Sequence, residues 1–290
     1  MAQLGINQLL ENQLNNNMSI NFNGKIFPSD QAIFDSQNRA FLYGDALFET
    51  IRMSEGKIPF LENHVNRLLQ GLHFFKYKIP KKFTSAFFKK EIKKVVTGNA
   101  RIRITVFRTR GGLYTPKNNR PQFLISTSPI SSPNYSLNKK GLNIGVFDEI
   151  KLPCTPISNF KTCNSSPYIL AGLNKQERNL DDVILLNDKG RISEASSSNI
   201  FFIKKNKIIT PSLSEACIAG TMRKTILEIA LEKKYIIQET QIKLTHLQNF
   251  EEIWLTNAIS GIKWVAQIGQ NISLQSPSHA QKLIASLNRY

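Results

Sequence analysis

The chain has 290 residues, enough for one large domain or two medium ones, and 41% of them are apolar, which supports a buried core. No window approaches the ~18 consecutive apolar residues of a membrane-spanning helix, so we expect no membrane partner. The formal net charge of +17 is interpreted first as solvated lysine-rich surface, and second as a field that attracts anionic substrates. The chain has no aromatic-and-arginine nucleic-acid module, so no nucleic-acid partner is expected.

Residues 1–17 are expected to be a polar N-terminal extension, rich in Asn and Gln, that carries no chemistry. Met18 could itself be a translation start, so a genuine tail and an upstream miscalled start both stay open. They lack the basic and apolar regions of a signal peptide. The cysteines, Cys154, Cys163 and Cys217, show no CxxC pairing and no histidine at metal-ligand spacing. They are typical of reduced thiols, so the sequence predicts a cytoplasmic protein without a metal site.

Residues 18–130 are predicted to form a small α/β domain. Apolar residues recur at helical spacing over 62–75, and a second helix over 83–96 carries lysines on its solvent face. Short apolar or alternating runs between turn residues predict strands at 21–27, 46–53, 57–60, 101–108 and 122–126. The stretch 126–136, rich in Ser and Pro, is the predicted linker to the next domain.

Residues 131–290 are predicted to form a larger domain. Helices are expected over 167–178, with Ser166 as the cap and Pro167 at the first position, and over 221–234. Strands are expected at 142–149, 183–186, 191–195, 200–203 and 207–209, and near 236 and 253. Because strands and helices are mixed without a strict βαβ repeat, a doubly wound sheet is not expected.

Two segments of the larger domain carry the most informative residues: Asn159-Phe-Lys161-Thr-Cys-Asn-Ser-Ser-Pro167 and Arg191-Ile-Ser-Glu194-Ala-Ser-Ser-Ser-Asn199. Further segments that match the family pattern, in the same order along the chain, lie at 41–52, 64–68, 101–108, 210–211, 220–223 and 255–259. Together they resemble the class IV aminotransferase family, fold type IV enzymes that use pyridoxal 5'-phosphate (PLP). The resemblance runs from about Asn23 to about Val265. It implies a mixed α/β fold with a small two-layer domain, a larger pseudo-barrel domain and the cofactor in the cleft between them.

Lysine is the side chain that forms a Schiff base with an aldehyde, and a carboxylate keeps a pyridine nitrogen protonated. The resemblance assigns the first role to Lys161, which also serves as base, and the second to Glu194. The small residues from Ala195 to Ser198 leave room for a flat ring. The expected cofactor is therefore PLP.

The phosphate of PLP needs arginine and free backbone N–H groups. The resemblance implies that Arg67 binds it through the guanidinium. It also implies backbone N–H contacts from Thr221 and Met222 at a helix start, and from Asn257 and Ala258 in a second loop. Many members have a threonine where this chain has Met222, so no side-chain hydroxyl bond is expected there.

Many members also place a tyrosine five residues after the lysine, on the O3' side of the cofactor. In this chain the matching residue is Ser166, and Tyr168 lies two positions further along. Because Tyr168 is out of register with the family position, the resemblance gives it no role.

Substrate-binding residues follow from the same resemblance. Tyr43, Arg103 and Arg108 match positions that line the substrate pocket in various members. Arginine suits a carboxylate, so the expected substrate is a small, anionic, amino-acid-like molecule. In relatives part of this pocket comes from a partner subunit, and a homodimer is therefore expected.

The family contains branched-chain and D-amino-acid aminotransferases as well as 4-amino-4-deoxychorismate lyases, so the reaction is the open question. The leading interpretation is the lyase, which releases pyruvate and forms 4-aminobenzoate. Thr50 stands where branched-chain aminotransferases have glycine, and its hydroxyl could protonate the leaving group, while Asn257 resembles the lyase version of its loop. The alternative is a branched-chain or D-amino-acid transaminase that uses 2-oxoglutarate. Another PLP chemistry, or a non-catalytic PLP-binding or regulatory protein, is more remote.

Overall fold

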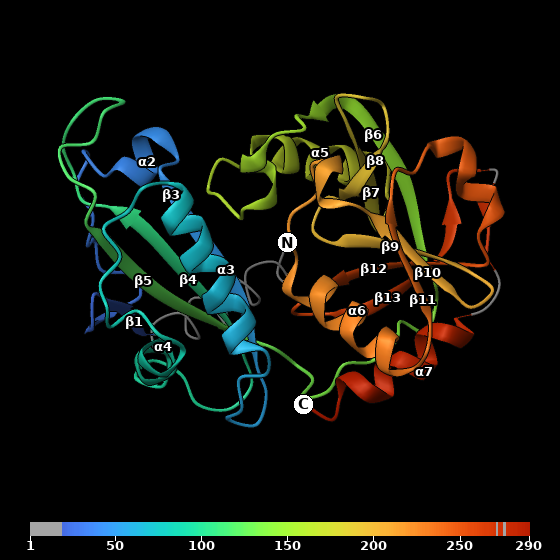
Figure 1. The fold of residues 1–290 in the computed structure, drawn as a ribbon. Helices are drawn as coiled ribbons and strands as arrows, with labels where there is room; N and C mark the ends of the chain where they lie inside the picture. The colour runs from blue at the N-terminus through green and yellow to red at the C-terminus, as the bar shows by residue number, and fades with distance from the viewer. Residues whose placement is uncertain (1–18, 271, 275–276) are drawn as a thin grey trace, which may run out of the picture. The chain divides into compact units, whose positions relative to one another are not determined.

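The computed structural model of the chain describes residues 19–270, 272–274 and 277–290. The expected polar extension over 1–17 lies outside the described residues. Helices and strands are interspersed along the described chain in a mixed α/β fold, which confirms the predicted fold class (Figure 1). In the described part, no helix is long and apolar enough to cross a membrane.

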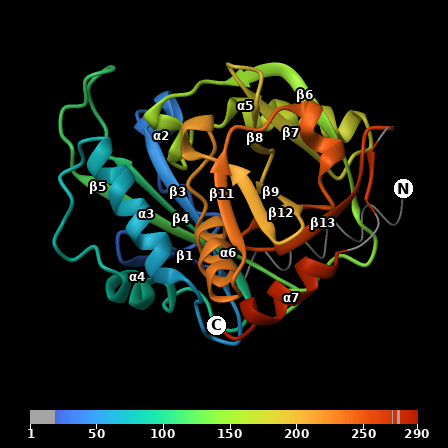
Figure 2. The same ribbon diagram turned by 45° about the vertical axis from the view of Figure 1, so that its right-hand side comes forward.

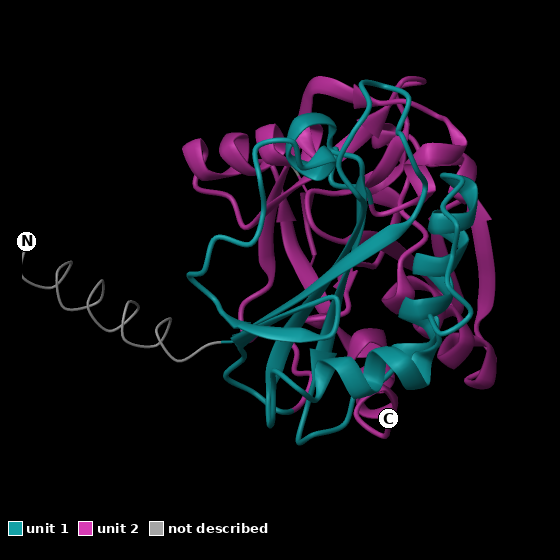
Figure 3. Cartoon of the chain, turned by 90° about the vertical axis from the view of Figure 1, so that its left-hand side faces the viewer, with its two compact units in different colours: residues 1–133, 162–164 teal, residues 134–161, 165–290 magenta. Residues whose placement is uncertain are grey.

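The described chain divides into two compact units (Figure 3). Unit 1 runs to Pro133 and includes Thr162–Asn164 from further along the chain. Unit 2 contains Asn134–Lys161 and Ser165–Tyr290. Lys161 is therefore the last residue of a unit 2 segment, and the residue after it belongs to unit 1.

Unit 1 contains the antiparallel strands β1 (Ser19–Phe22), β2 (Lys25–Pro28), β3 (Ala46–Met53), β4 (Ala100–Arg108) and β5 (Pro121–Pro129). Their order across the sheet is β2-β1-β5-β4-β3 (Figure 1). The short helix α2 (Arg39–Tyr43) precedes β3. Helix α3 (Leu61–Phe74) packs on β3 and against α4 (Ser85–Ile92).

The side chains of this sheet alternate between two faces, as the two-residue period of a strand requires. On β3, Ile51 is fully buried on one face, whereas Thr50 belongs to the other face and is half-buried. On β4, Ile102 is fully buried and Arg103 belongs to the face of Thr50. We call the face that carries Thr50 and Arg103 the polar face of unit 1.

Unit 2 contains β6 (Leu142–Leu152), β7 (Asp182–Asn187), β8 (Ile192–Ala195), β9 (Asn199–Lys204), β10 (Lys207–Pro211), β11 (Ile236–Thr240), β12 (Glu252–Asn257), β13 (Gly261–Ile268) and β14 (Ile272–Ser273). Their order is β11-β10-β9-β12-β13-β6-β7-β8, with β14 beside β13. Helix α5 (Ser166–Glu177) packs on β6 and β7. Helices α6 (Thr221–Glu232) and α7 (Ser278–Leu287) lie side by side (Figure 2). Short 3-10 helices occur at η1 (Pro156–Asn159), η2 (Leu213–Glu215) and η3 (Leu244–Asn249).

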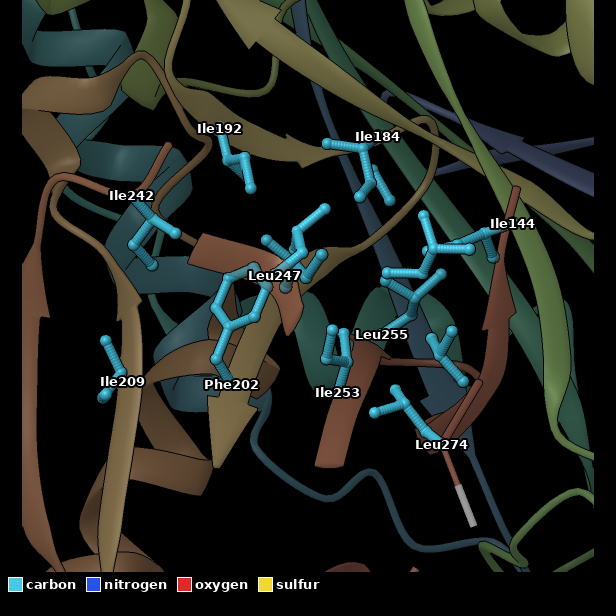
Figure 4. Close-up of a cluster of buried hydrophobic side chains, with 14 of the residues drawn as sticks. Ile144, Ile184, Ile192, Phe202, Ile209, Ile242, Leu247, Ile253, Leu255 and Leu274 are labelled. Atoms are coloured by element: carbon cyan, nitrogen blue, oxygen red, sulfur yellow. The ribbon is translucent and has the colours of Figure 1, made fainter. Parts of the chain in front are cut away.

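The sheet of unit 2 curls around one apolar core (Figure 4). Ile144 on β6, Ile184 on β7, Phe202 on β9 and Leu255 on β12 come from distant parts of the sequence and belong to the same cluster. Each is at most 2% exposed, and burial of a side chain of this size contributes roughly 1.5–3 kcal/mol. The core therefore fixes the strand ends from which the loops of the candidate site extend.

Gly261, at the start of β13, has a φ of +68°, and a Cβ there would lie 2.7 Å from Cδ1 of Tyr135. We predict that Gly261→Ala lowers the free energy of unfolding by about 2–4 kcal/mol, because left-handed strain adds to overpacking. Gly269→Ala is the matched control, since Gly269 also has a positive φ, +57°, but nothing within 4 Å of a Cβ. Urea denaturation measures both variants, and equal losses would contradict a role for the Tyr135 contact.

Candidate active site

Glu194 on β8 is a carboxylate that the protein buries and surrounds with donors. Its side chain is 3% exposed. Tyr168 donates its O–H to Oε1 at 2.6 Å, while Asn199 Nδ2 and the backbone N–H of Ile218 donate to Oε2 at 3.2 and 3.1 Å. Donors to the ionised form of a buried carboxylate stabilise its charge. This arrangement therefore favours a fixed negative charge on β8.

Two acidic groups beside this carboxylate stay protonated. Burial, and then the charge of Glu194, raises the pKa of Tyr168 far above its ordinary value of 10.0. The same two causes raise the pKa of Cys217 to about 12. At neutral pH Tyr168 is thus a donor and Cys217 a neutral thiol, so the negative charge belongs to Glu194.

Asn199 connects Glu194 to the start of α6. Its Nδ2 bonds Glu194, and a Cβ on Gly220 would clash with its Oδ1, so the two backbones approach closely only because residue 220 is a glycine. Gly220 is the N-cap residue of α6. The N–H groups of the first turn of that helix, beginning at Thr221 and Met222, point out of its N-terminal end. Together with the positive end of the helix dipole, they suit a phosphate.

The side chain of Asn257 forms hydrogen bonds within the loop after β12, the second loop that is expected to bind the cofactor phosphate. Its Oδ1 accepts the backbone N–H groups of Ile259 and Ser260 at 3.0 and 2.8 Å. Its Nδ2 donates to Oγ of Ser198 at 3.1 Å and to the backbone oxygen of Ser197 at 3.4 Å. The side chain is therefore used inside the protein, where it links the loop after β12 to the loop after β8.

Two residues that the sequence analysis missed hold these loops in place. Asp182, 5% exposed, accepts the N–H of Ser196 at 3.1 Å and its hydroxyl at 2.5 Å. Tyr135 donates its O–H to the backbone oxygen of Ala258 at 2.9 Å. A carboxylate at the start of an apolar strand needs partners when it is buried, so Asp182 carried a signal in the sequence. Tyr135 carried none.

Lys161 follows η1 in a segment that is tied to the loop before α6. The side chain of Asn159 donates to the backbone oxygen of Cys217 at 2.9 Å, and its backbone oxygen accepts the N–H of Ala219 at 3.0 Å. The residue between Cys217 and Ala219 is the one that donates to Glu194. Unit 2 therefore brings the segment of Lys161 beside the segment that binds Glu194.

The residues after Lys161 join the edge of β3 in unit 1. Thr162 forms a bridge with Leu47, and the N–H of Cys163 donates to the backbone oxygen of Ala46 at 2.9 Å. The backbone on the C-terminal side of Lys161 is thus held by a strand of the small unit. The backbone on its N-terminal side belongs to unit 2.

Thr50 and Arg103 are direct neighbours on the polar face of unit 1. The guanidinium carbon of Arg103 lies 3.7 Å from the ring centroid of Phe48, and one of its N–H groups donates to Sγ of Cys163 at 3.9 Å. None of the ion pairs among the described residues includes Arg103. The polar face therefore combines a hydroxyl with a cation that suits an anionic ligand.

Arg67 on α3 lies in a buried cluster with Glu49 and His64. Arg67 donates to the two Glu49 oxygens at 2.8 and 2.5 Å, and His64 Nδ1 donates to Glu49 Oε2 at 2.7 Å. Burial raises the pKa of Glu49, but the charge of Arg67 and the hydrogen bonds from His64 and Arg67 outweigh burial and bring the pKa to about 2. Glu49 and His64 had no role in the sequence analysis, and they orient the guanidinium of Arg67.

Arg108, expected near the substrate, lies in a second buried cluster of unit 1. It pairs with Asp45, donates to the backbone oxygen of Phe75 and donates to Oδ1 of Asn119 at 2.9 Å. Its guanidinium carbon lies 4.0 Å from the ring centroid of Tyr77. These N–H groups are used within the fold.

Tyr43 lies at the end of α2 and is 37% exposed. Its ring centroid is 5.7 Å from that of Tyr114 and 4.9 Å from the guanidinium carbon of Arg39. Arg39 also donates to backbone oxygens in the loop between β4 and β5, including that of Leu113 at 2.5 Å. Tyr43 is therefore placed beside a loop that a buried arginine holds.

Comparison with known proteins decides the family. Residues 46–268 match the model of the family described as Amino-transferase class IV, which covers more than half of the chain. The chain belongs to this family. It is a PLP-dependent enzyme, as the members of the family are.

Relatives of both expected reaction types are similar to the chain. The aminodeoxychorismate lyase of Vibrio harveyi is 28% identical over 240 residues, 80% of this chain and 86% of that protein. Branched-chain-amino-acid aminotransferase-like protein 2 of Arabidopsis thaliana is 26% identical over 253 residues, 84% of this chain but 44% of that longer protein. A branched-chain aminotransferase from Thermoproteus uzoniensis, solved with norvaline, aligns with a TM-score of 0.82 at 21% identity over 94% of this chain and 93% of its own. That likeness shows the fold.

The residues of unit 2 fit PLP. Glu194 offers a buried carboxylate to a ring nitrogen, and the start of α6 offers N–H groups to a phosphate. Two buried hydroxyls close to these groups in the sequence, Thr225 Oγ1 and Thr256 Oγ1, have no hydrogen-bond partner among the described residues. Thr225 lies one turn after Thr221 on α6, and Thr256 precedes Asn257. The donor set therefore has the chemistry that a phosphorylated pyridine requires.

The buried carboxylate of Glu49 predicts how stability depends on acid. Its pKa is about 2 in the folded protein against an ordinary value of 4.5. Its contribution to stability, about 3 kcal/mol, is therefore complete above pH ~5 and is lost as the pH falls towards 2. Urea denaturation should show a steeper loss across this window in the wild type than in Glu49→Gln. Parallel loss in the two proteins would contradict the assignment.

Proposed function

We propose that the protein is a 4-amino-4-deoxychorismate lyase, which releases pyruvate and forms 4-aminobenzoate. The observation that carries this proposal is the pairing of Thr50 with Arg103 on the polar face of unit 1. A hydroxyl can give a proton to a leaving group, and an arginine can bind a substrate carboxylate. The similarity to the Vibrio harveyi lyase over most of both chains supports this choice.

The assigned residues imply the following binding and proton-transfer roles. PLP, when bound, supplies an aldehyde for the substrate amine and a ring that accepts an electron pair from Cα. Nζ of Lys161 takes the Cα proton. Glu194 accepts the ring N–H and keeps that proton on the nitrogen. Thr50 gives its Oγ proton to the enolpyruvyl oxygen as the C–O bond to the substrate ring breaks, and the enolpyruvate released tautomerises to pyruvate. The proton that Lys161 took from Cα then returns to Oγ of Thr50, so the protein gains and loses no net proton.

We assign the cofactor phosphate to the residues that the family resemblance implies. The backbone N–H groups at Thr221 and Met222 and the backbone at Asn257 and Ala258 are the proposed donors of unit 2. Arg67 is the proposed donor of unit 1, and its bonds to a buried carboxylate keep its guanidinium rigid. A rigid guanidinium loses less entropy when it binds an anion than a mobile one does.

We propose that Tyr43 and Arg103 bind the substrate and that Thr50 is the proton donor. We assign Arg108 to the fold, because its N–H groups bond Asp45, Phe75 and Asn119. Within the described ranges Arg103 forms no ion pair, and it is the better partner for a substrate carboxylate.

An amino-acid transaminase is the second candidate. The similarity to the Arabidopsis thaliana protein supports it. Asn257 does not favour the lyase, because its side chain is bonded within its own loops. The purified protein should be incubated with aminodeoxychorismate, and separately with amino acids plus 2-oxoglutarate. Formation of a keto acid without any 4-aminobenzoate would replace the lyase by the transaminase.

We also propose that the protein acts as a cytoplasmic homodimer. Large apolar side chains are exposed in each unit: Phe41, Leu113 and Tyr114 in unit 1 are 82%, 76% and 89% exposed, and Ile169 and Leu173 on α5 are 62% and 50% exposed. Exposed apolar side chains of this size are the kind that a subunit interface covers.

Lys161 should be the residue that carries the cofactor. We predict that the holoenzyme is yellow, with an absorption band near ~400 nm from the lysine-linked cofactor. Lys161→Ala should lose the adduct that borohydride traps while the fold stays intact by circular dichroism. Mass spectrometry locates the adduct, and its appearance on another lysine would overturn the assignment.

Thr50 should separate the two reactions. Thr50→Val keeps the shape of the side chain but removes the hydroxyl, and general acid help contributes roughly 10²–10⁴-fold. We therefore predict at least a tenfold fall in 4-aminobenzoate formation with unchanged PLP affinity. Thr127→Val on β5 is the matched control, since Thr127 pairs with Ile102 and belongs to the opposite face of the sheet. Normal lyase turnover in Thr50→Val would remove Thr50 from the mechanism.

A further inference from the structure

The hydroxyl of Tyr168 makes the shortest of the hydrogen bonds described for Glu194. It donates to Oε1 at 2.6 Å, whereas the donors to Oε2, Asn199 Nδ2 and the N–H of Ile218, lie at 3.2 and 3.1 Å. Hydrogen bonds to charged acceptors are shorter and stronger than neutral ones. The two carboxylate oxygens are thus held from different sides by different elements, and the tyrosine holds one of them.

The ring of Tyr168 is fixed in place. Tyr168 lies in the first turn of α5, where its N–H donates to the backbone oxygen of Ser165 at 3.0 Å. The ring packs against a buried apolar cluster that includes Phe147, Ala171 and Leu185. Because the ring cannot turn away without losing these contacts, the hydroxyl is aimed at Glu194 in advance.

The hydroxyl also remains a donor at every working pH. Burial, together with the charge of Glu194, keeps the pKa of Tyr168 far above its ordinary value. An ionised phenol beside the carboxylate would place two negative charges within one hydrogen-bond length. The protonated phenol instead lowers the free energy of the carboxylate in its ionised form.

We propose that Tyr168 is a positioning residue that keeps Glu194 ionised and oriented, so that the proton shared with the cofactor's ring nitrogen stays on the nitrogen. The proposal rests on the PLP chemistry of the proposed function and applies equally to the lyase and to the transaminase. A buried carboxylate with fewer donors is a stronger base towards a neighbouring proton. Without the hydroxyl, the proton would shift towards Glu194, and the ring would become a poorer acceptor of electrons.

Tyr168→Phe tests this directly, because it keeps the packed ring and removes only the hydroxyl. The protein is loaded with PLP labelled with ¹⁵N in the ring, and its nitrogen resonance is recorded by NMR. We expect the resonance of Tyr168→Phe to move towards that of an unprotonated pyridine. We also expect kcat to fall by about tenfold or more, since a hydrogen bond to a charged group is lost. The dissociation constant of PLP, measured by fluorescence titration, should stay within about threefold.

Tyr235→Phe is the matched control. Tyr235 is another tyrosine of unit 2, and its hydroxyl lies 2.8 Å from His279 Nδ1 rather than near Glu194. It should leave the nitrogen resonance and kcat unchanged. The Glu194→Gln background supplies a second test, because a residue that acts through Glu194 has nothing further to lose there. In that background, Tyr168→Phe should change neither the resonance nor kcat.

The outcomes separate the inference from the proposed function. A wild-type protein that binds PLP with a protonated ring, and a Tyr168→Phe variant with the same resonance, would overturn the role of Tyr168. An equal fall in kcat with and without Glu194 would also overturn it, because it would show a structural effect. A wild-type protein that binds no PLP would instead refute the proposed function.

Discussion

A buried carboxylate is stable only where donors replace its lost hydration, and the candidate site depends on how Glu194 obtains them. Donors described for this carboxylate come from separate segments: Tyr168 from α5, Asn199 from β9 and Ile218 from the loop before α6. If one of these segments shifted, the buried carboxylate of Glu194 would lose a hydrogen-bond donor without regaining water. The start of α6 and the segment of Lys161 are tied to the same loop, so one charge sets the positions of several groups.

Much of the fold could be predicted, because periodicity reports buried faces directly. The strand expected over 46–53 is β3 with the same bounds, and the helices expected over 167–178 and 221–234 are α5 and α6 to within about two residues. The curled sheet of unit 2 was expected from the family resemblance rather than from any pattern. The helix α7 was not predicted.

The remaining errors arise where local turns override the pattern. The strand expected over 57–60 is wrong, because Glu55 and Gly56 both have positive φ and form a tight turn before α3. Ser165 rather than Ser166 is the N-cap of α5, and it makes no side-chain cap bond. The periodicity of apolar residues also does not show which side chain of a helix contacts a given strand. The contact between Tyr168 and Glu194, 26 positions apart, could therefore not be predicted.

The three residues Thr162–Asn164 belong to unit 1 although the chain on both sides belongs to unit 2. The bridge from Thr162 to Leu47 therefore joins β3 to a piece of chain made more than a hundred positions later. During synthesis on the ribosome, unit 1 acquires this edge only after the lysine-bearing segment has emerged. A gene split after Pro133 would give two fragments, and the first would lack the segment Thr162–Asn164 that bridges to Leu47.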